Sequence, residues 1–181
     1  YKEIERKTFY LLIPKPVSRL AIILGKCLGL MATTGLVTLL STIFLLVVLS
    51  LNNGSEYLGG ILLSTMLGLF EAMLLILISL LLSSLTSPIL AFLTTVVIYL
   101  VGHAGNIFQY IYMTTELPVV SAVTRVIYHL LPNLEKFNIR NEIVYGTLPS
   151  VSMVELSILY ALVYAALLLF LTVLVFRKKD F

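Results

Sequence analysis

Long apolar runs separated by short polar stretches dominate the chain, and this pattern predicts membrane-spanning helices. The first run covers residues 20–51, the second 58–82, the third 88–112 and the last 152–176. Each run reaches the roughly 20 residues that a helix needs to cross a bilayer. The pattern therefore predicts an all-α integral membrane protein, with four transmembrane helices visible in this sequence.

The breaks between the runs carry turn and capping signals. The sequence NNGS at 52–55 is a turn that ends the first run, and Ser87 is a cap before Pro88 at the first helical position. The turn 83–88 is short and uncharged, so the second and third runs should form a tight antiparallel pair. The sequence SMVE at 152–155 matches a capping box and should begin the last helix.

Residues 113–151 differ from the runs on either side, because charged residues and prolines divide them into short pieces. Apolar pieces such as 119–123 and 126–131 are too short to cross a bilayer. Such pieces are typical of amphipathic or re-entrant helices at a membrane surface. We therefore expect an external region of this kind between the third and the last transmembrane helix.

The first 19 residues hold much of the chain's charge and precede the first apolar run. Their charged side chains cannot lie in lipid, and Pro14 and Pro16 end any helix that begins near residue 2. Glu3 and Lys7 form an i, i+4 pair in the favourable order. We expect a short helix on the cytoplasmic membrane surface, suited to anchoring the chain or to docking a soluble partner, and then a proline turn.

The basic residues of the chain gather at the ends of the apolar runs. The sequence is 60% hydrophobic and 12% charged with a formal net charge of +3, and its loop 52–57 has no Lys or Arg. By the positive-inside rule, four spans place both ends in the cytoplasm, including the tail 177–181. This indicates a multi-pass protein of the cell (cytoplasmic or inner) membrane. Bases at span ends, rather than in a patch, argue against nucleic-acid binding.

Three polar residues inside the apolar runs are candidates for a role within the membrane. Glu71 interrupts the second run near mid-depth, where a carboxylate normally faces a bundle interior or a wet cavity. His103 and Asn106 lie in the polar second half of the third run, and His103 is expected to line the same cavity. The structural alternatives are an interhelical hydrogen bond for Glu71 and helix packing for His103.

Common sequence motifs of catalysis and metal binding are absent. The sequence contains no GxxxxGK[ST] phosphate-binding loop, so any ATP hydrolysis must occur in a partner. It also lacks HExxH, CxxC and GxSxG, and its one cysteine, Cys27, rules out an internal disulfide. We therefore predict no catalytic residue, no metal site and no cofactor in this chain.

A series of short motifs resembles the ABC type-2 permease family, and within it the branch associated with multicopper-enzyme maturation. The series begins with EIERKT at 3–8, KPVSR at 15–19 and LGK at 24–26. It continues with LSSLTSP at 82–88, LPNLEKFN at 131–138 and FRKKDF at 176–181. The resemblance covers the whole chain and depends on the order and spacing of the motifs together.

The resemblance implies a transmembrane permease subunit of an ATP-driven ABC exporter, usually with six spans, of which this sequence would carry the last four. Residues 1–19 would include the coupling helix, and the side chains that contact a separate ATPase would be Glu3, Glu5, Arg6, Lys7, Thr8 and Tyr10. ATP and Mg would be bound by that ATPase. The implied partners are the ATPase, a second permease subunit in a homo- or heterodimer, and membrane lipid.

Two other functions remain open from the residues alone. A structural or assembly subunit of the membrane would share the docking surface, but it would show no substrate-dependent stimulation of an ATPase. An intramembrane enzyme would use Glu71 and His103, and it requires these side chains to meet in one water-accessible site.

Overall fold

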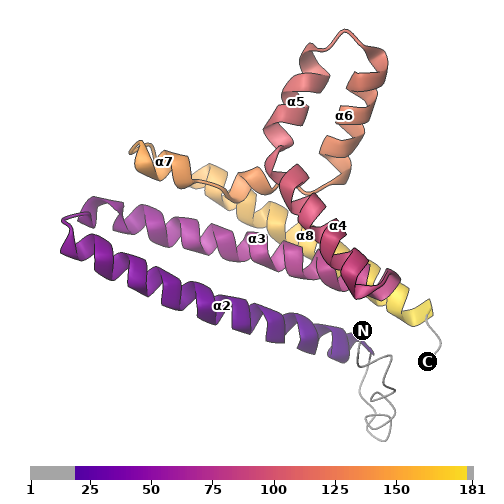
Figure 1. Cartoon of the computed structure of the whole chain (residues 1–181), viewed down its shortest axis with the longest axis horizontal. Coiled ribbons are helices and arrows are strands. Elements are labelled where there is room, and N and C mark those ends of the chain that lie inside the picture. The colour runs from indigo at the N-terminus through magenta and orange to yellow at the C-terminus, as the bar shows by residue number, and fades with distance from the viewer. Residues whose placement is uncertain (1–18, 179–181) are drawn as a thin grey trace, which may run out of the picture.

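The structure is a computed structural model that describes residues 19–178 and is shown in Figure 1. Every regular element in this part of the chain is a helix, as the hydrophobic pattern predicted, and the chain is an all-α integral membrane protein. The elements are α2 (Arg19–Leu51), η2 (Ser55–Tyr57), α3 (Leu58–Leu85), α4 (Pro88–His103), α5 (Gly105–Thr114), α6 (Pro118–Leu130), η3 (Leu134–Phe137), α7 (Arg140–Val144) and α8 (Val151–Lys178). The predicted surface helix and all of its coupling residues lie outside the described residues.

The helices α2, α3 and α8 form the body of the molecule (Figure 1). Each contains an apolar stretch long enough to cross a membrane, namely Ile23–Leu51, Ser55–Leu85 and Val151–Phe176. The central helix is α3, which packs against α2, α4 and α8. Its Leu67, Leu74 and Leu77 are buried in one core with Ala161 and Ala165 of α8. The two alanines let the helix backbones approach closely, which is how helices associate where lipid is as apolar as the side chains.

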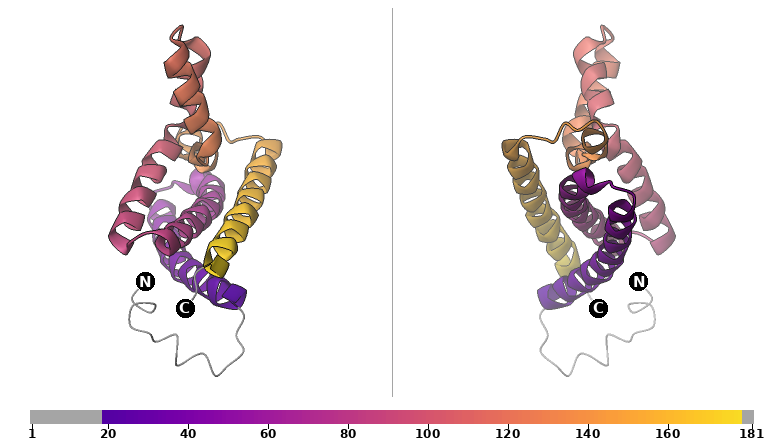
Figure 2. Two further views of the ribbon diagram at one scale, coloured as in Figure 1. Left: turned by 90° about the vertical axis from the view of Figure 1, so that its right-hand side faces the viewer. Right: turned by 90° about the vertical axis from the view of Figure 1, so that its left-hand side faces the viewer.

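The two ends of the described chain lie at the same end of the bundle. The start of α2 and the end of α8 are near each other and near the turn between α3 and α4 (Figures 1 and 2). The turn between α2 and α3 lies at the opposite end, where Asn53 has a φ of 59°. Asn tolerates this left-handed conformation better than most residues, so the turn forms where the sequence predicted one.

The helix predicted over 88–112 is not a single rod. It is divided into α4 and α5, which are bent by 59° at a break beside Ala104. The 16 residues of α4 extend about 24 Å, less than the roughly 30 Å of a bilayer's hydrocarbon core. The described residues therefore contain three helices able to span a membrane, or four if the bent pair is one span.

The region between α4 and α8 has two parts. The helices α5 and α6 form a hairpin that projects away from the bundle (Figure 1), and Ser121 Oγ donates to the Tyr112 carbonyl at 3.1 Å. The chain then returns to the bundle through residues 131–139, which contain η3. The short helix α7 follows, near the turn between α2 and α3 (Figure 1).

The start of α8 corrects the predicted capping box. The helix begins at Val151, and the Met153 N–H donates to Ser150 Oγ at 3.4 Å. Ser152 lies inside the first turn, so Ser150 is the capping residue. The prediction was wrong here because Ser150 and Ser152 both precede an apolar run, and the sequence spacing favoured the second.

Candidate functional site

Three ionisable side chains from three different elements meet beside the break between α4 and α5. Glu71 comes from the middle of α3, His103 is the last residue of α4, and Glu135 belongs to η3. His103 Nε2 lies 2.9 Å from Glu71 Oε1, and His103 Nδ1 lies 3.2 Å from Glu135 Oε2. We call these three residues the carboxylate–histidine triad.

The two contacts of the imidazole need at least two hydrogens between them. A carboxylate oxygen only accepts, so each of the two hydrogen bonds needs one hydrogen. These are supplied by an imidazolium between two carboxylates, or by a neutral imidazole that donates to one carboxylate and accepts from the other in its protonated form. In both arrangements the triad has one net negative charge.

The triad lies in a partly enclosed setting. The side chains of Glu71, His103 and Glu135 are 12%, 24% and 29% exposed. Tyr99 packs edge-on against the imidazole, with the ring centroids 4.7 Å apart. The Asn138 amide nitrogen lies 3.4 Å from both Glu135 oxygens. Because an ionisable residue at membrane depth is costly unless it has partners, these contacts explain how Glu71 is tolerated in an apolar helix.

Two glycines allow the segment 131–139 to reach the break in the helix. A Cβ added at Gly102 would lie 2.7 Å from Leu134 Cγ and 2.9 Å from the Pro132 carbonyl oxygen. A Cβ at Gly105 would lie 2.8 Å from the Asn133 side chain. Any larger residue at either position would push the segment away, so these glycines bring Glu135 within reach of His103.

Side chains of α8 hold the same segment from the other side. The Asn133 N–H donates to Tyr160 Oη at 2.9 Å, and Ser157 Oγ donates to the Lys136 carbonyl at 3.2 Å. Tyr164 Oη donates to the Leu130 carbonyl at 3.0 Å. These bonds satisfy backbone groups that have no helical partner, which irregular backbone requires at membrane depth.

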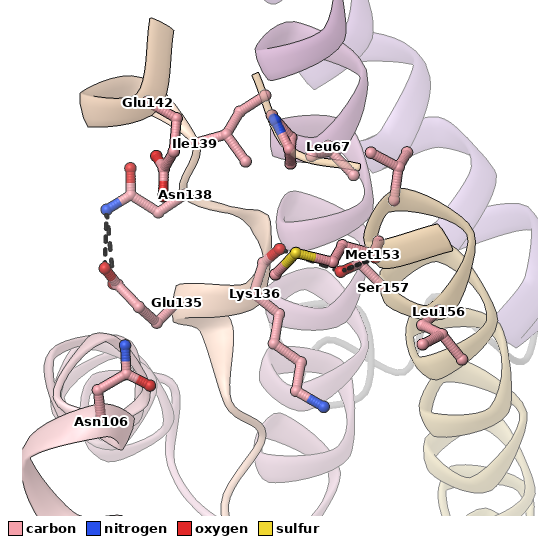
Figure 3. Close-up of a pocket in the computed structure, with 12 residues that line it drawn as sticks. Leu67, Asn106, Glu135, Lys136, Asn138, Ile139, Glu142, Met153, Leu156 and Ser157 are labelled. Atoms are coloured by element: carbon pink, nitrogen blue, oxygen red, sulfur yellow. Dashed lines mark hydrogen bonds between the residues drawn. The ribbon is translucent and has the colours of Figure 1, made fainter. Parts of the chain in front are cut away.

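Three neighbouring cavities surround the triad. The triad itself lines a cavity of about 240 Å³, together with Ser64, Gly68, Tyr99, Phe137, Asn138 and Arg140. Glu71 also lines a cavity of about 650 Å³ between α2, α3 and α7. Glu135 also lines a third cavity of about 360 Å³, shown in Figure 3, with Asn106, Asn138 and Glu142. The triad thus lies where polar side chains and open space coincide in the bundle.

The structure brings together two of the three residues singled out inside the apolar runs. Glu71 and His103 are in direct contact. Asn106 is exposed and lines the third cavity, where Figure 3 shows it on the α5 side opposite Lys136. Glu135 was not among the predicted site residues, although it lies in the LPNLEKFN motif. A carboxylate between the apolar residues Leu134 and Phe137 of that motif is the signal that could have identified it.

Glu71 and His103 meet beside one cavity, as an intramembrane enzyme would require, but the imidazole has no unoccupied nitrogen. Both ring nitrogens of His103 face carboxylates, so neither is free to take a proton from a substrate. Among residues 19–178, no group of three His, Cys, Asp or Glu side chains could hold a metal ion. The arrangement can hold and share hydrogens, tie three elements together, and place negative charge beside a cavity.

Comparison with known proteins identifies a family. The model of a family described as ABC-2 family transporter protein matches residues 1–181. No curated protein and no solved structure matches the chain. The family match covers the whole sequence, including the residues that the structure leaves undescribed.

Proposed function

We infer the function of the chain from its family: it belongs to the ABC-2 transporters and is a multi-pass permease subunit of an ABC transporter. Members of this family are typically membrane subunits without enzymatic activity, and they work with an ABC ATPase. The match over residues 1–181 is the observation on which the inference depends. The narrower resemblance to the multicopper-enzyme-maturation branch stays a prediction.

We propose that the chain is the permease of an ATP-driven exporter in the cell membrane, with both of its ends in the cytoplasm. A separate ATPase would bind ATP and Mg, and a second permease subunit would complete the path. The chain has no phosphate-binding loop of its own, which supports a division of labour between subunits.

The proposed contact with the ATPase is the charged segment before the first span, with Glu3, Glu5, Arg6, Lys7, Thr8 and Tyr10. Charged and aromatic side chains suit a polar interface that transmits motion. The proposed path passes the triad, because Glu71 and His103 are polar groups beside cavities in an apolar bundle. An ionisable residue in such a place commonly marks a transport path.

The test is assembly with the ATPase. Replacing Glu5 and Arg6 together by Ala should weaken co-purification of the ATPase by about five- to thirty-fold, the effect of losing 1–2 kcal/mol at an interface. Glu116→Ala with Arg125→Ala is the matched control, because it removes the same two charges from exposed positions of the region after α5. Undiminished assembly and transport in the first variant would count against the proposal.

A second measurement separates a transporter from a structural subunit. The assembled complex in liposomes should hydrolyse ATP faster when a transported compound is present. The screen of compounds should include long-chain amines. If the complex assembles but no compound stimulates its ATPase, the chain has a structural role.

A further inference from the structure

Two of the cavities beside the triad adjoin each other. The cavity of about 650 Å³ between α2, α3 and α7 and the cavity of about 240 Å³ around the triad share lining residues. The shared residues are Ser64, Gly68, Glu71 and Arg140. We call the two together the joined cavity. Its larger part alone lies within the roughly 300–1,000 Å³ typical of small-molecule sites.

The larger part of the joined cavity is mainly apolar. Its walls include Leu45 and Leu49 of α2, Ile61 and Leu75 of α3, and Ile143 of α7. Leu45 on its wall is 44% exposed. The larger part therefore suits an apolar body.

The smaller part is polar, and two carboxylates line it. Glu71 and Glu135 contribute four carboxylate oxygens, whereas His103 contributes at most two N–H groups. In the two arrangements described above the triad has one net negative charge, and Arg140 is the one Lys or Arg among the described residues that line this end.

Arg140 makes no ion pair with the triad. It lines both parts of the joined cavity, and it is exposed. An exposed guanidinium is screened by water, so its effect on the inner end is small. Its position suits a hydrogen-bond acceptor or an anionic group of a ligand, at a point farther from the triad.

We propose that the joined cavity binds an amphipathic amine, with its ammonium group at Glu71 and Glu135 and its apolar body between α2, α3 and α7. An ammonium group supplies three donors and one positive charge, which complement the carboxylate oxygens and the negative charge of the triad. Tyr99 lines the same end, and aromatic rings also attract ammonium groups. The inference deepens the proposed function, since a molecule bound here in an exporter would be its cargo.

The first test compares head groups on a constant tail. The full-length chain, assembled with its ATPase in phosphatidylglycerol nanodiscs, is labelled with a diazirine-bearing long-chain amine and mapped by mass spectrometry. Dodecylamine should compete about ten-fold better than dodecanol or dodecanoate, the effect of one charge-assisted hydrogen bond. The labels should fall on α2, α3 and α7. Equal competition by the three compounds would overturn the proposal.

The second test uses variants at each part of the cavity. Glu71→Gln removes the charge at nearly constant size, and Glu155→Gln, at an exposed position near the start of α8, is its control. Gly68→Leu fills the cavity, since a Cβ there meets no atom within 4 Å. Gly59→Leu on the same helix is its control, because its Cβ is also unobstructed and it lines neither part. Labelling should fall about ten-fold in Glu71→Gln and Gly68→Leu only.

Labelling that is the same in each variant as in its control would overturn the proposal. If Glu71→Gln fails to fold, Gly68→Leu and the head-group series decide the question by themselves. Replacing half of the phosphatidylglycerol by phosphatidylethanolamine, compared with the same replacement by phosphatidylcholine, separates two sources of the amine. A fall in labelling would identify an amine-bearing lipid as the occupant, and unchanged labelling would identify a free amphipathic amine.

Assembly with the ATPase is measured in the same samples. Intact assembly without amine-selective labelling would overturn this inference and leave the proposed function standing. Amine-selective labelling in a chain that binds no ATPase would support this inference and overturn the proposed function.

Discussion

The helix α2 and the segment 131–139 show that hydropathy and burial are separate properties in this protein. The stretch Ile23–Leu51 of α2 has a mean hydropathy of 2.4, yet only 6% of its apolar window is buried inside the protein. The segment 131–139 carries Glu135 and Lys136, yet its Leu134 and Phe137 are 0% and 1% exposed. The more polar segment therefore lies closer to the centre of the protein.

The physical reason is that lipid surrounds a membrane protein with material as apolar as its own side chains. An apolar residue gains little by leaving lipid for the protein interior, so hydropathy does not decide which helix is central. An irregular segment cannot face lipid, because its backbone groups would lack partners. The segment 131–139 is therefore held inside by Tyr160, Ser157 and the glycines of the helix break.

The largest expected difference between the two regions comes from removing one aromatic ring in each. Phe137→Ala should lower stability by about 3 kcal/mol, because it leaves a cavity that the packed surroundings cannot fill. Phe44→Ala on α2 is the matched control, since Phe44 is 72% exposed and lipid or detergent fills the space. Thermal unfolding of the purified protein in detergent measures both. Equal shifts for the two variants would contradict the central position of η3.

A smaller difference is expected from enlarging a glycine. Gly102→Val should cost about 1–3 kcal/mol through overpacking, because a Cβ would lie 2.9 Å from the Pro132 carbonyl oxygen, a backbone atom that cannot rotate away. Gly29→Val on α2 serves as the comparison, since a Cβ there meets no atom within 4 Å. The same unfolding measurement applies. If Gly102→Val melted like Gly29→Val, the close approach of residues 131–139 to the break would be wrong.

The smallest effect concerns a single hydrogen bond. Tyr160→Phe removes the hydroxyl that accepts from the Asn133 N–H and should cost about 1 kcal/mol. Tyr110→Phe, at a residue that is 69% exposed on α5, should change stability by less than about 0.5 kcal/mol. Faster amide hydrogen exchange at Asn133 in Tyr160→Phe alone would locate the effect. Unchanged exchange there would show that Tyr160 does not hold the segment.

Much of the fold could be predicted because the relevant signals are local. The runs 20–51 and 58–82 correspond to α2 and α3, and the turn at 52–55 and Pro88 mark helix ends in the structure. Chain hydropathy and turn residues act over a few neighbours, so they can be read without knowing what lies across the bundle. The choice of Glu71 and His103 as candidates was local in the same way, since each is a polar residue in an apolar run.

The tertiary structure alone decided what those residues touch. Both contacts of His103 are with residues 32 positions away, and one of them, Glu135, lies in a segment whose polarity suggested the membrane surface. The break beside Ala104 likewise depends on two glycines meeting a loop that is distant in the sequence. Hydropathy determines which parts of this chain can enter a membrane, whereas close packing and unsatisfied backbone groups determine which of them meet.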